Sequence, residues 1–231
     1  MSEILLAHNH DTSFKALAKM LNDNLNQIYS HDPPHLQLCD NGVGRDIVSI
    51  VTRSLKDDLP QLIASIKKGD TLLPQVIIAK SISISPPQTG ITPMKFQYKE
   101  TVKLVNEVDE NDFVTLRGQS FAYESPAQIV ILSRDDFVAQ ELSLSIVNIL
   151  ANSKTVKYDL PMKSITDDTY YRVKDVGNLK LKNINTMVFS DATDNDSGMV
   201  VVAAEFNILD NYFIFREWND IATQYTVNST P

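Results

Sequence analysis

The segment from Gln119 to Ser153 constrains the fold more than any other part of this chain. It reads QSFAYESPAQIVILSRDDFVAQELSLSIVNILANS, in which two strand-like runs precede a helical pattern. Ser133 and Asp136 have the Ser-x-x-Asp spacing of a capping box, which predicts the start of the helix. Apolar residues at helical spacing then predict one buried stripe, made of Phe137, Val138, Leu142, Ile146, Ile149 and Leu150. This segment is built for packing and carries no catalytic pattern.

Upstream of this segment, the sequence predicts two helices and two strands. Apolar residues at i, i+3, i+4 and i+7 predict a helix over 11–29, with a buried stripe that includes Ile28. Strands are expected at 46–53 and 76–85, and a second capped helix is expected between them, over 54–68. Three residues can cap the first helix: Asp11, Thr12 and Ser13.

Downstream, the pattern is mainly that of strands. Residues 113–132 predict one or two strands, with a break near Ser125 and Pro126. Residues 154–182 are polar and are expected to be irregular, with short strands at most at Tyr158 and Tyr170. Two late strands then follow.

These late strands form a closing pair. Residues 183–190 and 199–209 are expected to be antiparallel neighbours, joined by the acidic turn Asp191–Gly198. Residues 212–218 can extend the sheet. Because strands and helices do not alternate regularly, the sequence favours an α+β fold, a mixed and mostly antiparallel sheet flanked by a few amphipathic helices.

Composition indicates a single domain over residues 1–231, because no internal repeat or domain-scale linker is visible. Residues 86–112 are expected to form a mobile loop or insertion after two consecutive prolines. No secretory signal or membrane-spanning run is recognised, and the single cysteine, Cys39, fits a reducing cytoplasm. The net charge of −8 argues against nucleic-acid binding, although an acidic surface lets DNA slide past it.

A metal site is one alternative reading of the histidines. His31, His35 and Cys39 share a spacing of four residues, and His8 or His10 could add a ligand. Pro33 and Pro34 break the helical register between the first two, so scattered polar residues in a loop are expected instead. Cys39 as a nucleophile lacks an orienting context.

A calcium loop is a second alternative. Asp194, Asp196 and Glu205 occupy positions 1, 3 and 12 of such a loop, but Met199 stands where the motif needs glycine. An acidic turn is the preferred interpretation. Neither a Gly-x-Ser-x-Gly elbow nor a phosphate-binding loop is present, so no cofactor and no enzymatic activity are expected.

Aromatic residues are dense near the C-terminus. As core residues they need no function, and as surface residues they would suit an oligomer contact. The two readings have similar weight. With the acidic turn they give the candidate interface residues Asp191, Asp194, Asp196, Tyr212, Phe213, Phe215 and Trp218.

Two regions together resemble the phage tail terminator family, whose members are also called tail completion or tail sheath stabiliser proteins. The run from Tyr123 to Asp136, continued by the helix to Leu150, resembles the family's central strand–helix unit. The stretch from Asn185 to Ile208 is similar to its C-terminal strand pair with an acidic loop. The resemblance covers about half of the chain and rests on order and spacing, and the segment 90–112 departs from it.

The resemblance implies a structural virion protein. Such a protein forms a ring, usually a hexamer, that ends the tail tube, contacts the sheath in contractile tails, and joins the neck. DNA passes through the lumen without specific binding, and a closed ring needs two different contact patches on each subunit. The alternatives are another neck, tube or baseplate component, or a soluble metal-dependent enzyme that uses the histidines and Cys39.

Overall fold

The computed structural model describes residues 4–7, 9–29, 39–40, 43–44, 46–51, 73–80, 85, 96–97, 102–106, 113–163, 170–191 and 199–217. The helices in these ranges are α1 (Asn9–Ile28), α3 (Asp136–Asn152) and the short 3-10 helix η1 (Ile184–Thr186). The strands are β1 (Ile4–Ala7), β2 (Cys39–Asp40), β3 (Val43–Gly44), β4 (Val48–Val51), β5 (Gln75–Lys80), β6 (Phe96–Gln97), β7 (Val102–Asn106), β8 (Phe113–Ser133), β9 (Thr155–Lys163), β10 (Tyr170–Lys182), β11 (Ser190–Asp191) and β12 (Val200–Glu217).

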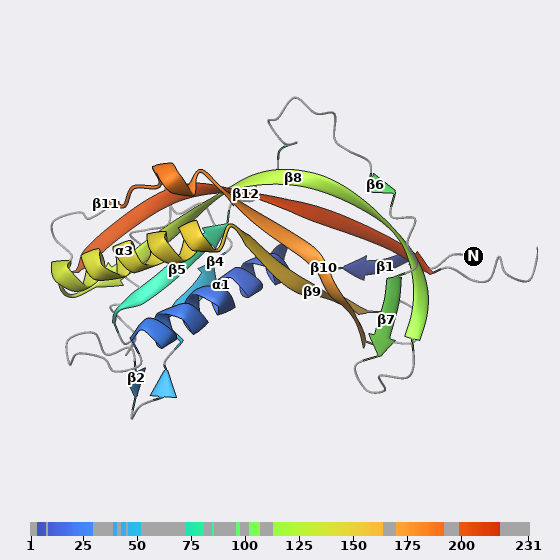
Figure 1. Ribbon diagram of the computed structural model, residues 1–231, viewed down its shortest axis with the longest axis horizontal. Coiled ribbons are helices and arrows are strands. Elements are labelled where there is room, and N and C mark those ends of the chain that lie inside the picture. Colours follow the sequence, from blue (N-terminus) through green and yellow to red (C-terminus); the bar gives the residue numbers. More distant parts are fainter. Residues whose placement is uncertain are drawn as a thin grey trace, which may run out of the picture.

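Two long antiparallel strands, β8 and β12, run the length of the molecule as an arch (Figure 1). They pair without interruption from Val200 opposite Ser133 to Glu217 opposite Leu116. At one end β5 joins the outer edge of β8, and β4 pairs with β5 in parallel. All other strand pairs are antiparallel, so the mixed, mostly antiparallel α+β fold expected from the sequence is confirmed.

At the other end the sheet closes on itself. Strand β12 pairs with β1, β1 with β9, β9 with β10, β10 with β7, and β7 with β8, which returns to β12. The middle of β12 also pairs directly with the end of β10, where Ile208 lies opposite Leu181. Strand β1, which the sequence did not predict, is therefore the piece that links β12 to β9.

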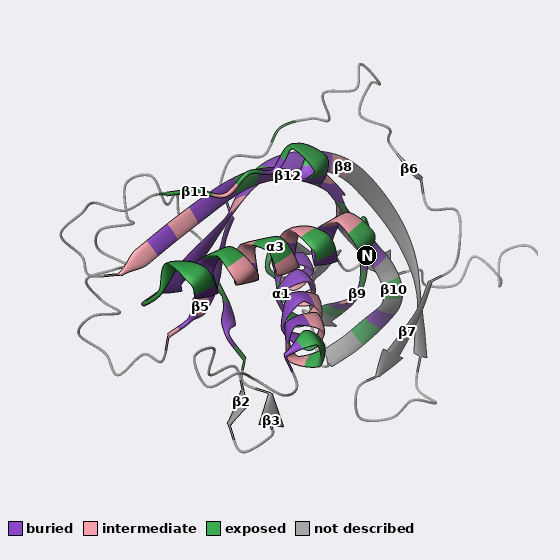
Figure 2. Ribbon diagram, turned by 60° about the vertical axis from the view of Figure 1, so that its left-hand side comes forward, coloured by how far each residue is buried: buried purple, intermediate pink, exposed green. Residues whose placement is uncertain are grey.

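Helices α1 and α3 pack against the same concave side of the arch (Figures 1 and 2). The main core joins both helices to inward residues of β8, β9, β10 and β12; its largest fully buried side chains include Phe14, Leu17, Leu21, Leu25 and Ile129. A smaller cluster lies on the opposite face of the sheet at β5, and includes Ile77, Val130, Leu132 and Val201. Both faces of the sheet are thus buried at the end where β5 lies.

Helix α1 confirms the predicted first helix, but its start and end differ in detail. It begins at Asn9, so Asp11, Thr12 and Ser13 lie inside the first turns and the predicted cap is wrong. Ile28 is half exposed, because the buried stripe ends with Leu25 and Tyr29. The Tyr29 hydroxyl lies 2.7 Å from the Ser145 hydroxyl and joins α1 to α3.

Helix α3 confirms the predicted central helix with two corrections. Asp135 rather than Ser133 is the N-cap, because its carboxylate accepts the backbone N–H groups of Phe137 and Val138. Ser133 instead accepts the Asp135 N–H in the preceding turn. Phe137 is 61% exposed and lies outside the buried stripe, which contains Val138, Ala139, Leu142, Ile146, Ile149 and Leu150.

The predicted break in β8 at Pro126 is wrong. Glu124 exchanges both backbone hydrogen bonds with Ser85, on the side of β8 away from β12. Backbone groups alternate between the two neighbours of an antiparallel strand, so Pro126 faces the same side as Glu124. Its missing N–H therefore removes no hydrogen bond from the β8–β12 ladder, and the strand continues.

Residues 154–182 are not irregular, contrary to expectation. They form the long hairpin of β9 and β10, in which Val156, Tyr158 and Leu160 point into the core at a period of two. A bulge places residues 174–176 of β10 opposite Asp159 alone, and Asp175 adopts a φ of 54° there. The alternation of these residues with polar ones is itself the pattern of a half-buried strand, so the sequence does contain this signal.

The predicted strand over 183–190 is also wrong. Asn183 takes a left-handed conformation with a φ of 62° and starts η1, so only Ser190 and Asp191 pair with β12. The predicted helix over 54–68 and most of the predicted loop over 86–112 lie outside the described residues. The described residues of 86–112 form strand β6, which pairs with β8, and strand β7, which pairs with β8 and β10. Within the described part, neither helix is long and apolar enough to span a membrane.

Candidate functional site

The predicted metal-binding residues are not gathered into a site by the described part of the chain. His31, His35, Asp194 and Asp196 lie outside the described residues. Glu205 is exposed on β12 opposite Gln128, as expected for a strand residue. Among the described residues, no group of histidine, cysteine and acidic side chains is placed to hold a metal ion.

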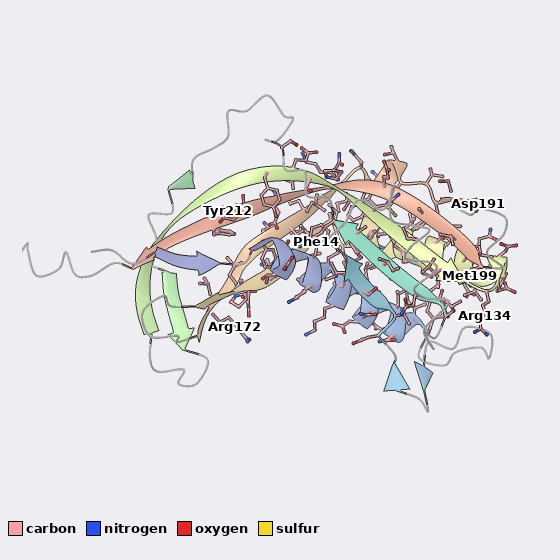
Figure 3. All side chains as sticks on the ribbon, turned by 180° about the vertical axis from the view of Figure 1, so that it is seen from behind. Phe14, Arg134, Arg172, Asp191, Met199 and Tyr212 are labelled. Atoms are coloured by element: carbon pink, nitrogen blue, oxygen red, sulfur yellow. The ribbon has the colours of Figure 1, made fainter. Side chains whose placement is uncertain are left out.

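The candidate interface residues lie far apart. Asp191 is exposed and pairs with Val202 near the start of β12. Tyr212, which is 43% exposed, follows ten residues after Val202, or about 33 Å along the strand (Figure 3). Phe213 points the other way and is 3% exposed in the core. The side chain of Phe215 and all of Trp218 lie outside the described part.

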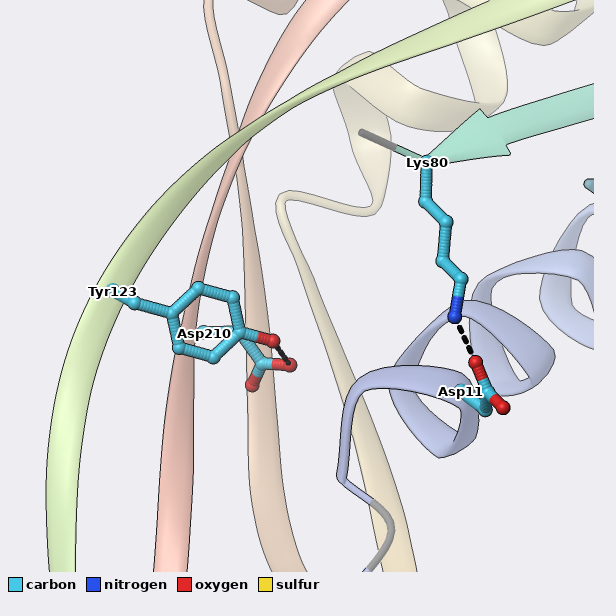
Figure 4. A network of polar contacts seen from close by, with 4 residues as sticks. All are labelled: Asp11, Lys80, Tyr123 and Asp210. Carbon is cyan, nitrogen blue, oxygen red and sulfur yellow. Dashed lines mark hydrogen bonds and ion pairs between the residues drawn. The ribbon is translucent and has the colours of Figure 1, made fainter. Parts of the chain in front are cut away.

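A buried carboxylate, that of Asp210, joins four elements of the fold. The residue is 1% exposed. Its Oδ1 accepts the Tyr158 hydroxyl at 2.7 Å and the Asn211 N–H at 2.8 Å, and its Oδ2 accepts the Tyr123 hydroxyl at 3.1 Å (Figure 4). The side chain of Ser13 on α1 also hydrogen-bonds to it. The carboxylate therefore ties α1 to β8, β9 and β12.

Burial dominates the electrostatics of this network. Loss of hydration raises the pKa of the Asp210 carboxyl above its usual value, although hydrogen bonds from Tyr158, Asn211, Ser13 and Tyr123 oppose the shift. Burial and the nearby Asp210 carboxylate also raise the pKa of both tyrosines. Neither hydroxyl is thus an activated acid or base near neutral pH, and the network acts as a structural anchor.

Gly177 on β10 makes room for this anchor. A Cβ atom at position 177 would come within 2.2 Å of the Tyr158 ring, which lies directly over the glycine. Any larger residue would push the ring away and displace its hydroxyl from Asp210.

The position of Asp210 in the sequence is a usable signal for this anchor. Asp210 follows the inward-facing Phe206 and Ile208 at a period of two, so it is also expected to face inward, where a buried polar residue needs a hydrogen-bond partner.

A second buried polar group, the Lys80 ammonium, sits at the end of β5. Its side chain is almost fully buried and forms an ion pair with Asp11, on the first turns of α1 (Figure 4). Burial lowers the pKa of Lys80. The pair fixes the start of α1 against the sheet, which explains why Asp11 lies inside the helix instead of capping it.

Asn22 is the third polar anchor of α1. Its Oδ1 accepts the backbone N–H groups of Ile47 and Val48, both at 3.0 Å, and its Nδ2 lies 3.4 Å from the Val48 carbonyl oxygen. The Ile47 carbonyl faces β5, so the groups of Val48 point to the outer edge of β4. The asparagine amide thus occupies that edge as a neighbouring strand would.

An open groove of about 650 Å³ lies between α1 and β9. One wall is the polar side of α1, and the other is the start of β9 with the residues that flank it. The lining includes Ala16, Lys19 and Met20 on α1, and Thr155, Val156, Lys157, Tyr158 and Asp159 on β9.

The outer side of α3 differs from that of α1. Leu144 is 66% exposed, and the neighbouring exposed residues along this side are Phe137, Gln140 and Asn148. The helix contains no lysine or arginine. Figure 2 shows exposed residues along this outer side. The outer side of α3 thus combines two exposed apolar side chains with exposed amides, and the helix also carries the acidic residues Asp136 and Glu141. Exposed large apolar side chains are typical of protein interfaces.

A scan against models of known protein families finds no match to this chain, and a search of curated proteins finds no similar sequence.

Proposed function

We propose that this protein is a structural component of a phage virion, a ring-forming subunit that ends the tail tube and joins it to the neck. The observation that carries the proposal is the outer side of α3, where Phe137 and Leu144 are exposed. Large apolar side chains that are exposed on a surface helix favour contact with another protein. The buried polar groups of the fold support the same view, because they hold elements together.

The tail terminator assignment rests on the sequence resemblance, and the fold supports it. Strand β8 leads through a two-residue turn into α3, as in the family's central unit. The late strand pair is much shorter than the resemblance implies, since only the two residues of β11 pair with β12. In the proposed virion, the subunit forms a hexameric ring that contacts tube, sheath and neck proteins, and DNA passes its acidic lumen. The protein is then not an enzyme.

Self-association provides the first test. We expect the purified protein, alone or on isolated tails, to form rings, with mass measured by light scattering. Phe137→Glu combined with Leu144→Glu places two charges on the outer side of α3 and should abolish both rings and tail binding. Gln27→Glu is a control, because it adds a charge to the exposed side of α1.

Electron microscopy of intact particles decides the position. We expect density for this protein in the last ring of the tail tube, next to the neck. A position in the baseplate or along the tube would favour the alternative structural roles. A strictly monomeric protein that binds neither tails nor neck complexes would overturn the proposal.

A further inference from the structure

The groove between α1 and β9 runs along a strand edge, over 155–159, that pairs with no described residue. Lys154 accepts the Leu181 N–H from β10, so the backbone groups of Val156 and Tyr158 also face β10. Those of Thr155, Lys157 and Asp159 face the opposite edge. In the described part of the chain, the strand on that edge is β1, which pairs only with Met162 and Lys163.

The groove lies along this edge. Side chains of consecutive strand residues point to opposite faces of a sheet, so a groove on one face is lined by every second residue. This groove is lined by every residue from Thr155 to Asp159. The backbone edge of β9 therefore forms its wall, and the N–H groups of Thr155, Lys157 and Asp159 face into it.

The dimensions suit one added strand. Five residues of β9 line the groove, and five strand residues span about 16 Å. Along α1, the lining runs from Thr12 to Asn24, or about 18 Å. The groove volume of about 650 Å³ lies in the range typical of ligand sites. Pro161, which lacks an N–H, limits the edge on the side of β1.

Charge in the groove is arranged along its length. Tyr158 and Ser13 share Asp210, so the start of α1 lies beside Tyr158 and Asp159. Lys15 and Lys19 of α1 therefore lie along the central part, whereas the side chain of Lys157 points to the face of β9 away from Val156 and Tyr158. The acidic lining residues lie toward the ends: Asp159, with Asp175 donating its N–H to it, at one end and Asp23 at the other. A carboxylate is the complementary charge for the centre.

We propose that this groove binds an extended peptide segment of a partner protein as an extra strand on β9, with an acidic side chain of that segment facing Lys15 and Lys19 of α1. Backbone hydrogen bonds to the free edge supply affinity, and the central lysines supply specificity. The proposal does not rest on the assignment to a phage tail.

Hydrogen exchange of the protein alone tests whether the edge is open. The amides of Thr155, Lys157 and Asp159 are expected to exchange much faster than those of Val156, Tyr158 and Leu160, which bond to β10. Slow exchange of the Lys157 amide in the free protein would overturn the proposal, because the edge would already be paired.

Binding is tested with a labelled synthetic heptapeptide that has threonine at odd positions, valine at positions two and six, and glutamate at position four. Fluorescence anisotropy should show saturable binding, and the Lys157 amide should become protected. A peptide with lysine in place of glutamate should bind about tenfold or more weakly, as should the glutamate peptide on the variant Lys19→Glu. Lys180→Glu is the matched control on the exposed part of β10 and should bind normally.

N-methylation separates strand addition from simple charge attraction. Methyl groups on the nitrogens of alternate residues block the hydrogen bonds of one peptide edge only. One of the two alternately methylated peptides should therefore lose binding, while the other keeps it. Equal binding of both, or no binding of the glutamate peptide, would overturn the proposal.

Discussion

The two helices that cover the sheet hold their positions by different means. Helix α1 presents charged residues to solvent and anchors itself inside through polar contacts of Ser13 and Asn22. Helix α3 packs inside through aliphatic side chains and presents Phe137 and Leu144 outside. The exposed side of α1 is therefore charged, whereas the exposed side of α3 carries large apolar side chains that suit contact with another protein.

The largest effects should come from the inner sides, where the helices are alike. Leu21 on α1 and Leu142 on α3 are both fully buried. Replacing either with alanine leaves a cavity and should lower the free energy of unfolding by about 2–5 kcal/mol, measured by urea titration. Leu144→Ala is the control and should change it by about 0.5 kcal/mol at most in the monomer. A loss at Leu144 as large as that at Leu142 would place the outer side of α3 in the core and remove the contrast.

The polar anchors should separate the two helices. Asn22→Ala leaves buried backbone N–H groups of Ile47 and Val48 without their acceptor, so we expect a loss of about 1–3 kcal/mol in unfolding free energy. Ser145→Ala, which removes the hydroxyl beside Tyr29, should cost less, about 0.5–1.5 kcal/mol. Faster amide exchange at Val48 should accompany only the first variant. Equal costs would show that α3 depends on polar contacts as much as α1 does.

The pH dependence should reveal the charge that α1 helps to bury. Burial raises the pKa of Asp210 in the folded protein above the value in the unfolded chain, about 3.9. The folded state then holds the proton more tightly, and the free energy of unfolding falls as the pH rises from the unfolded-state pKa through the folded-state pKa. Urea titrations at several pH values should show the protein losing stability relative to Asp210→Asn across that window. A relative gain would mean that the hydrogen bonds outweigh desolvation.

The smallest effects on stability should occur at the outer sides, where the effects on association differ most. Leu144→Glu and Gln27→Glu each add one charge at an exposed helical position, so each should change the monomer's unfolding free energy by about 0.5 kcal/mol at most. Thermal unfolding at low protein concentration measures this. A loss of association with Leu144→Glu alone would then reflect the surface itself. Strong destabilisation by Leu144→Glu would instead mean that the side chain packs within the subunit.

Periodicity in the sequence predicted the elements whose buried faces are uninterrupted. Helices α1 and α3 carry apolar residues at one clear helical period, and the strands β4, β5, β8 and β12 contain short apolar runs. The hairpin of β9 and β10 does carry an alternating pattern in β9, but the bulge at Asp175 interrupts the pattern in β10. Asparagine is enriched in the left-handed conformation, so Asn183 offers a local turn signal, but the apolar residues after it favoured a strand.

The candidate sites were harder to predict because they depend on register between distant segments. The residues next to Tyr123 and Tyr158 in the sequence do not show that both hydroxyls face Asp210. The two tyrosines lie 87 and 52 residues before Asp210, and they meet it only because the strands that carry them come together in the fold. The open edge of β9 likewise depends on where β1 ends. The exposure of Phe137 depended on an offset of one residue. The N-cap is Asp135 and the buried stripe begins at Val138, which lies about 100° around the helix from Phe137.

The uninterrupted pairing of β8 with β12 has a mechanical consequence. The hydrogen bonds between antiparallel strands lie perpendicular to the strands, so opposite pulls along the two strands load the whole ladder side by side in shear. Eighteen residue pairs, from Val200 with Ser133 to Glu217 with Leu116, would share such a load. A force that peels β11 away from β12 meets only two pairs in its path. The molecule should therefore be stiff along the arch and give way first at that short edge.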